Sequence, residues 1–221
     1  MKEKIFKEWK RALLEFSKGG SFFRLSEGDS GLAQYKGILL ETFHQAGVNP
    51  QIQAFCTLYF KNNPRKMIDL FYKHAISEIG HDMLAHNDLV AMGVASEDII
   101  KSKPLPTTLA LNSYIIYQIQ FVNPISYLGY LFHLEFFPTT SGGGIMEMLG
   151  AAGVPDHAMS FLKEHSTVDI GHNKLMEKYL EHFVRDEVAL ESVIDTAIGT
   201  CQLHLLMMEK AMENGERKFR K

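Results

Sequence analysis

Three residues of the segment EHSTVDIGHNKL have the types and the spacing of a metal-binding group. His165, Asp169 and His172 stand at positions i, i+4 and i+7. In an α-helix these positions fall within roughly 60° of one another, so the three side chains project from one face. Two imidazoles and a carboxylate on one face form a half-site for a divalent transition metal. A polar surface stripe is the alternative, but the apolar residues between them favour an inward orientation.

Two further segments carry residues that could complete such a site. Glu78 and His81 are separated as Glu-x-x-His, the spacing by which di-iron helical bundles supply one carboxylate and one imidazole per helix. Taken alone this pair is a weak signal, because both residue types are common on helix surfaces. Glu135 lies in the apolar run 127–137, where a carboxylate is costly to bury unless it is paired or binds a metal. No arginine stands nearby in the sequence, which favours the metal.

The three segments together predict a centre for two ferrous ions that is built from three helices. Mixed oxygen and nitrogen ligation favours iron, or an iron–manganese pair, over zinc. Glu78, Glu135 and Asp169 are the expected catalytic carboxylates, which set the charge of the centre and, for Glu135, bridge the ions. The predicted metal ligands are Glu78, His81, Glu135, His165, Asp169 and His172.

These motifs resemble those of the haem-oxygenase-like di-iron oxidases, relatives of the TenA and PqqC-type fold. The resemblance covers residues 30–213 and includes the segment SEIGHDMLAHNDLVAMG. It implies a bundle of about seven core helices that activates dioxygen, with an electron donor, to oxidise a small organic substrate such as a fatty acid or an amino acid. It also implies a homodimer. The chain departs from the family where Ser77, rather than a second glutamate, precedes Glu78.

Three other polar residues near these motifs have open roles. Glu41 and His44 form a second Glu-x-x-His, and the expectation is that they orient the ligands rather than bind metal. His74 precedes His81 by seven residues and is placed on the same side of its helix.

The elements that must position these residues are predicted to be helical almost throughout. Helices are expected at 2–17, 30–46, 50–61, 64–92, from Ser96, and at 107–122, 124–137, 145–151, 156–182 and 186–213. Pro138 and the glycines at 142–144 are expected to interrupt the chain. The whole chain, 1–221, is predicted to be one all-α haem-oxygenase-like domain, with 1–29 as an N-terminal helix and loop outside or at the edge of the core.

The bulk composition restricts the partners. The net charge of -3 does not suggest binding to nucleic acid or to an anionic membrane, and no apolar run is free enough of polar residues to span a bilayer. No secretory signal is visible at the start. Cys56 and Cys201 stand in apolar surroundings and are expected to be buried, reduced thiols of a cytoplasmic protein.

Several alternatives remain open. A ferritin-like bundle could recruit Glu41 as a ligand, although His165 would then be surplus. A cofactor-free or hydrolytic TenA-like or PqqC-like enzyme would need a cysteine or an acid pair. A haem oxygenase would need His44 as its proximal ligand, and would not explain the 165–172 motif. A non-catalytic interaction protein and an enzyme that modifies its own side chain are the remaining possibilities.

Overall fold

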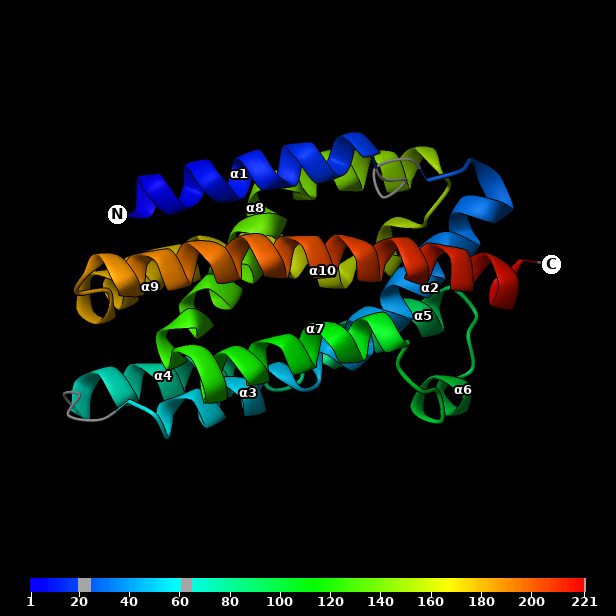
Figure 1. Ribbon diagram of the computed structural model, residues 1–221. Helices are drawn as coiled ribbons and strands as arrows, with labels where there is room; N and C mark the ends of the chain where they lie inside the picture. The colour runs from blue at the N-terminus through cyan, green and yellow to red at the C-terminus, as the bar shows by residue number, and fades with distance from the viewer. Residues whose placement is uncertain (20–24, 61–64, 221) are drawn as a thin grey trace.

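The computed structural model describes residues 1–19, 25–60 and 65–220, apart from the side chains at 19, 167–170 and 172–173. Every regular element in these ranges is helical, which confirms the all-α prediction (Figure 1). The helices are α1 (Lys2–Gly19), α2 (Gly28–Ala46), α3 (Asn49–Thr57), α4 (Arg65–Ser77), α5 (His81–Ala91), α6 (Ser96–Ile100), α7 (Pro106–Tyr117), η1 (Gln118–Val122), η2 (Pro124–Ser126), α8 (Tyr127–Ala151), η3 (Asp156–Ala158), α9 (Ser160–Phe183) and α10 (Glu187–Phe219).

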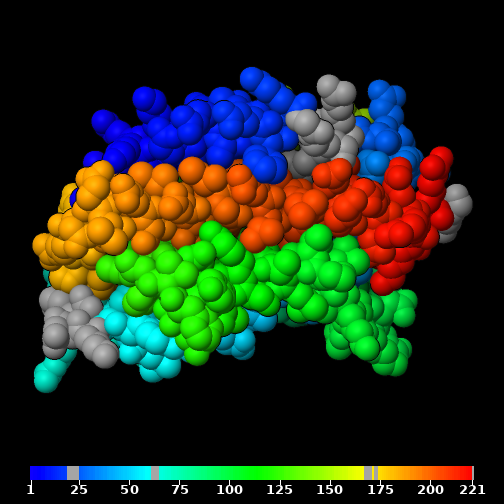
Figure 2. Space-filling model, in the orientation of Figure 1, coloured from blue at the N-terminus to red at the C-terminus, as the bar shows by residue number. Residues whose placement is uncertain are grey.

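Helix α10 is the central element of the molecule. It contains 33 residues, begins where the Asp186 carboxylate accepts a hydrogen bond from the Ala189 N–H, and contacts α1, α2, α7 and α8. Figure 2 shows it as a band between α1 and α7. A helix this long spans the molecule and gives its neighbours one surface to pack on.

Helix α2 crosses α10 at unusually short range because two glycines meet there. A Cβ added at Gly37 would lie 2.0 Å from the carbonyl oxygen of Ala211, and one added at Gly215 would lie 2.2 Å from that of Ala33. Only residues without a side chain allow this approach. The crossing positions α2, which lines one wall of the candidate site.

Helix α1 packs its apolar stripe into the main hydrophobic core. Ile5 and Trp9 are fully buried there and Leu13 nearly so. These residues are spaced four apart, so they lie on one face of the helix predicted at 2–17. The indole of Trp9 therefore reaches α8, where it meets His133.

The prediction of one continuous helix at 64–92 is wrong, because the structure has two helices there, separated by a turn after Ser77. Helix α4 ends there, α5 begins at His81, and Gly80 between them has a φ of +95°. Glycine adopts this left-handed conformation without steric cost, so it can end one helix and redirect the next. Glu78 consequently lies in the turn between two helices.

The predicted interruption at Pro138 and residues 142–144 is also wrong, since α8 runs through both. A proline removes one backbone hydrogen bond and bends a helix without necessarily ending it. The hydroxyl of Thr139 donates to the carbonyls of Glu135 and Phe136 at 3.2 Å, and apolar contacts on the buried face hold the helix together. Figure 1 shows α8 changing direction along its length.

Other differences concern helix ends. Helix α2 begins before Ser30, whose hydroxyl bonds Glu216 instead of capping the helix, and α10 extends to Phe219. Among the helices of the described ranges, none combines the length and apolarity required to cross a membrane.

Candidate metal centre

Five side chains form two clusters that share Glu78. One cluster contains His74, Glu78 and Glu135, and the other contains Glu78, His81 and His165. Within each cluster, ligand-type atoms lie within 4.8 Å of one another. This spacing suits a single metal ion per cluster, with one carboxylate between the two.

The turn between α4 and α5 explains how Glu78 serves both clusters. His74 stands near the end of α4 and His81 is the first residue of α5. The Glu78 oxygens lie 3.7 Å from His74 Nε2 and 3.0 Å from His81 Nδ1. Glu135 approaches from α8, with its Oε1 3.1 Å from His74 Nε2. His74 and Glu135 are buried, so their polar atoms meet inside the bundle.

His165 is held in one orientation on α9. Its Nδ1 lies 2.8 Å from the carbonyl oxygen of Phe161, and the two rings stack with centroids 4.0 Å apart. A carbonyl only accepts, so Nδ1 carries the hydrogen and Nε2 keeps the lone pair that a metal needs. Burial, and secondarily the neighbouring His81, lowers the pKa of His165, which favours this neutral form.

The start of α9 is fixed by a carboxylate from α5. Asp88 is buried and accepts hydrogen bonds from the Ser160 N–H (2.9 Å), the Ser160 hydroxyl (2.6 Å) and the Phe161 N–H (2.9 Å). It satisfies backbone donors at the helix N-terminus that have no partner within the helix. Asp88 thereby ties α9, which carries His165, to α5, which carries His81.

The remaining predicted ligands, Asp169 and His172, lie outside the described side chains. Helix α9 includes both positions, C-terminal to His165. The structure therefore brings together four of the predicted ligands, Glu78, His81, Glu135 and His165, and adds His74 to them.

The sequence contains a signal for the involvement of His74 in the candidate centre. The residues His74, Glu78 and His81 repeat the spacing of His165, Asp169 and His172, a histidine followed by an acid at +4 and a histidine at +7. The repeated spacing places His74 in the same relation to Glu78 as His165 has to Asp169.

Glu41 and His44 do not belong to either cluster. The Glu41 carboxylate accepts from the Leu105 N–H at 2.9 Å and from the Thr108 hydroxyl, so it caps α7. Nε2 of His44 lies 2.8 Å from the hydroxyl of Ser102. Both residues hold the connection between α6 and α7, and the expectation that they orient the metal ligands is not supported by these contacts.

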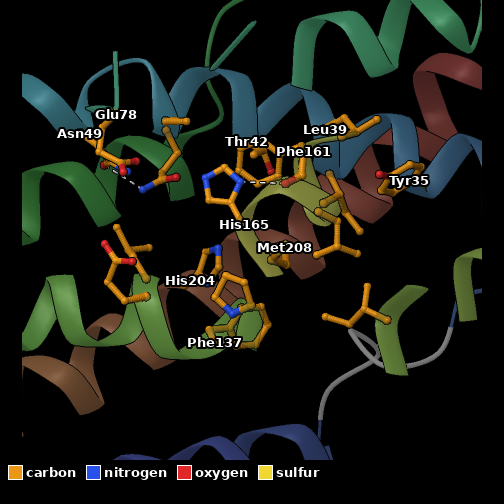
Figure 3. Close-up of a pocket in the computed structure, with 18 of the residues that line it drawn as sticks. Tyr35, Leu39, Thr42, Asn49, Glu78, Phe137, Phe161, His165, His204 and Met208 are labelled. Carbon is orange, nitrogen blue, oxygen red and sulfur yellow. Dashed lines mark hydrogen bonds between the residues drawn. The ribbon is translucent and has the colours of Figure 1, made fainter. Parts of the chain in front are cut away.

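A cavity of about 120 Å³ opens beside the clusters. Figure 3 shows Glu78 and Asn49 at one end, His165 and His204 in the middle, and Tyr35 toward the other end. Most of the wall is apolar. The lining residues are Leu25, Tyr35, Ile38, Leu39, Thr42, Gln45, Ala46, Asn49, Gln53, Glu78, Tyr127, Leu131, Leu134, Glu135, Phe137, Pro138, Ile145, Met148, Leu149, Phe161, Leu162, His165, His204 and Met208.

The polar part of the cavity wall is neutral apart from the two glutamates. Tyr130 donates to the Asn49 side-chain oxygen at 2.6 Å, and Gln45 donates to the same oxygen at 3.0 Å. No lysine or arginine occurs among the described residues that line the cavity. Without a metal, such a cavity has no positive group to offset the two carboxylates.

The two cysteines are buried and free, as predicted. Burial raises the pKa of Cys201 to about 12 and raises that of Cys56 as well. A raised pKa keeps each thiol protonated, and a protonated thiol is a poor nucleophile.

The fold and the site together define a helical-bundle protein with a cluster of histidines and carboxylates that could hold metal. Comparison with family models identifies the class of protein, because the model of the family of iron-containing redox enzymes matches residues 44–204. The chain belongs to this family. A search of curated proteins finds no match.

Two solved structures show the same fold. A domain of unknown function with a haem-oxygenase-like fold from Shewanella denitrificans superposes with a TM-score of 0.83 at 22% identity, covering 96% of this chain and 90% of that one. A TenA homologue from Pseudomonas syringae superposes with a TM-score of 0.68 at 13% identity, covering 96% and 92%. These likenesses confirm the haem-oxygenase-like fold; the ferritin-like alternative was wrong.

Proposed function

We propose that this protein binds two ferrous ions in the paired clusters and uses dioxygen to oxidise a small organic substrate held in the adjoining cavity. The observation that carries the proposal is the sharing of Glu78 between two histidine–carboxylate clusters. Iron bound there would supply the electron-transfer steps of dioxygen reduction, which amino-acid side chains do not provide. An external electron donor would restore the ferrous state.

The side chains would have distinct tasks. His74, His81 and His165 offer neutral nitrogens, and Glu78 and Glu135 offer the negative charge that balances the ions. Asp169 and His172, on the same helix as His165, are proposed to complete the ligand set. The buried walls of the cavity would exclude water from the reactive region.

A cofactor-free enzyme of the same fold is the main competing function. Such an enzyme would need a reactive thiol or an acid pair. The thiol is disfavoured because both cysteines are buried with raised pKa values, and iron loading distinguishes an acid pair formed by Glu78 and Glu135 from a metal centre. A haem oxygenase is disfavoured because His44 bonds Ser102 and is absent from the cavity wall.

Metal content measured after anaerobic loading with ferrous iron tests the proposal. The wild-type chain should retain about two irons, and His74→Ala and His81→Ala about one each, because each removes a ligand from one cluster. Glu78→Ala should lose most of both, because this residue is common to the clusters. The loaded wild-type protein should consume dioxygen when the two are mixed in a stopped-flow instrument.

His157→Gln is the matched control, since His157 is exposed on η3. This variant should load as much iron as the wild type. A folded wild-type chain that retains no iron, or a Glu78→Ala variant that loads normally, would overturn the proposal.

A further inference from the structure

A chain of hydrogen bonds leads from the buried indole of α1 to the cavity. The Trp9 Nε1–H donates to His133 Nδ1 at 2.9 Å, and His133 Nε2 lies 2.8 Å from His204 Nδ1. The three residues come from α1, α8 and α10, and His204 lines the cavity. None of them is in either metal cluster.

The chemistry of the indole fixes the direction of every bond in this chain. Tryptophan only donates, so His133 Nδ1 must accept and the ring hydrogen of His133 must lie on Nε2. His133 therefore donates to Nδ1 of His204, which places the hydrogen of His204 on its own Nε2. Protonation of either imidazole would put a second hydrogen into an existing donor–acceptor pair and would break a bond.

The packing around the two imidazoles holds this arrangement. The Phe137 ring stacks on His133 with centroids 5.4 Å apart and lies edge-on to His204 at 5.3 Å. Trp9 and His133 are fully buried, and His204 is 7% exposed. Burial lowers the pKa of both histidines, to about 4 for His204, in agreement with the neutral forms that the bonds require.

The Nε2–H of His204 remains able to donate a hydrogen bond to a molecule in the cavity. Among the described residues none accepts a hydrogen bond from this nitrogen, whereas the other ring nitrogen is bonded to His133. Phe137 and Met208 line the cavity with His204, so the donor lies in mainly apolar surroundings. A polar group in such surroundings gains most when a ligand acceptor meets it.

We propose that His204 hydrogen-bonds the substrate, and that the cavity takes a mainly apolar molecule that carries one uncharged oxygen acceptor, a carbonyl or a hydroxyl. The proposal rests on the proposed function in that the cavity is taken as the substrate site. The ferrous ions of the proposed function would lie at the clusters and not on His204, and the described wall has no lysine or arginine. One neutral donor does not offset the cost of burying a carboxylate, so the acceptor that meets His204 is uncharged. Trp9 and His133 are positioning residues, which act only by fixing the tautomer of His204.

Helix α1 has a functional role in this proposal through Trp9. Trp9 lies outside residues 44–204, the part matched by the family model. Neither Trp9 nor His133 lines the cavity. Helix α1 therefore acts on the cavity indirectly, through the hydrogen bonds of His133 and His204.

The first test is the tautomer of each imidazole, measured by ¹⁵N NMR on the full chain without iron. The wild type should show both His133 and His204 as single Nε2–H tautomers. Trp9→Phe removes the donor that fixes the direction and should give a mixture. Phe6→Leu is the control, because Phe6 packs 5.5 Å from the Trp9 ring without entering the hydrogen-bond chain.

The second test is a matched pair of probes, cyclohexanone and methylenecyclohexane, which differ only in an oxygen acceptor. A cavity of this size is comparable to those that admit a single six-membered ring. Their affinities can be followed through the methyl signal of Met208. His204→Leu should reduce the ketone-to-hydrocarbon affinity ratio about five- to tenfold. Trp9→Phe should reduce it less, and Phe6→Leu should leave it unchanged.

A wild-type His204 with its hydrogen on Nδ1, or an unchanged affinity ratio in His204→Leu, would overturn the inference. Neither measurement needs iron. Failure of iron loading would therefore refute the proposed function and leave these results standing, whereas iron loading with a mobile His204 tautomer would refute only the inference.

Discussion

At the scale of single residues, the candidate centre depends on hydrogen bonds that orient its ligands. His165 is directed by the Phe161 carbonyl, and Asp88 holds the backbone of the same turn. A ligand whose other nitrogen is already committed binds metal without losing rotational freedom, so these contacts matter as much as the ligands themselves.

Removing the Asp88 carboxylate should destabilise both the fold and the centre. Asp88→Ala leaves three donors at the start of α9 without their acceptor, and we expect a loss of about 2–3 kcal/mol in the free energy of unfolding. Urea denaturation measures this loss, and iron titration should show weaker loading. Asp98→Ala changes an exposed aspartate of α6 and should shift stability by no more than about 0.5 kcal/mol. Equal effects of the two variants would contradict the assignment.

The sequence predicted much of the candidate centre, because ligand types and helical spacing are local properties. Residue type and spacing predict Glu78, His81, Glu135 and His165, and the structure places these four together. For His74 the heptad spacing from His81 predicts only its side of the helix, and the acid at position 78 between them is what completes the repeated motif. The tautomer of His204 could not be predicted, since it depends on Trp9, which is 195 residues away in the chain.

At the scale of elements, the turn between α4 and α5 is the feature on which both clusters depend. Gly80→Ala should cost about 1–2 kcal/mol, because alanine is strained at a φ of +95°. It should also reduce iron loading, because the strained turn carries Glu78. Calorimetry and metal analysis on the same sample separate the two effects.

Gly93→Ala is the matched control for this turn. Gly93 has a φ of +82°, follows α5, and like Gly80 has no atom within 4 Å of an added Cβ. The strain should be similar, so stability should fall by a similar amount while iron loading stays at the wild-type level. A loss of iron in both variants would show that the turn has no special role.

The crossing of α2 and α10 should not tolerate a side chain. Gly37→Ala forces a methyl group against a backbone carbonyl, and we expect about 3 kcal/mol of destabilisation in a urea melt. Gly144→Ala, in α8 with no atom within 4 Å of the added Cβ, should instead stabilise the protein by about 0.5–1 kcal/mol. A tolerated Gly37→Ala would mean that the two helices are not in contact there.

The helix predicted from 124 begins instead with the 3-10 turn η2, and α8 starts at Tyr127. The predicted boundaries agree with the structure where helix-start residues and apolar periodicity coincide, as at the starts of α1 and α7. They failed at residues 78–80, where a glycine redirects a helix without a proline nearby, and at Pro138, where tertiary packing outweighs a helix breaker. The two failures differ in cause. The break at Gly80 is local, because a glycine in the left-handed region redirects the chain, whereas at Pro138 the packing of the buried face of α8 outweighs the local preference to end the helix.

At the scale of the whole molecule, two imidazoles that must stay neutral make stability depend on pH. The pKa of His204 is lowered to about 4 by burial, and that of His133 is lowered as well. Below about pH 6.5 the unfolded chain binds these protons and the folded chain does not, so stability falls on acidification. For His204 alone the loss between pH 6.5 and 4 is about 3 kcal/mol.

Urea denaturation at pH 7 and at pH 5 checks this prediction. The wild type should lose stability between the two, and His204→Leu should lose less because one of the titrating groups is gone. The same pH dependence in the wild type and the variant would mean that His204 contributes nothing to it.

The chain has one tryptophan, and it is the buried Trp9 that donates to His133. All indole fluorescence of the protein therefore comes from a single position at the junction of α1 and α8. Emission from an indole that is excluded from water is blue-shifted, and it shifts to the red when the indole meets solvent. The protein thus contains a native optical reporter, whose emission wavelength follows the docking of α1, with no label attached.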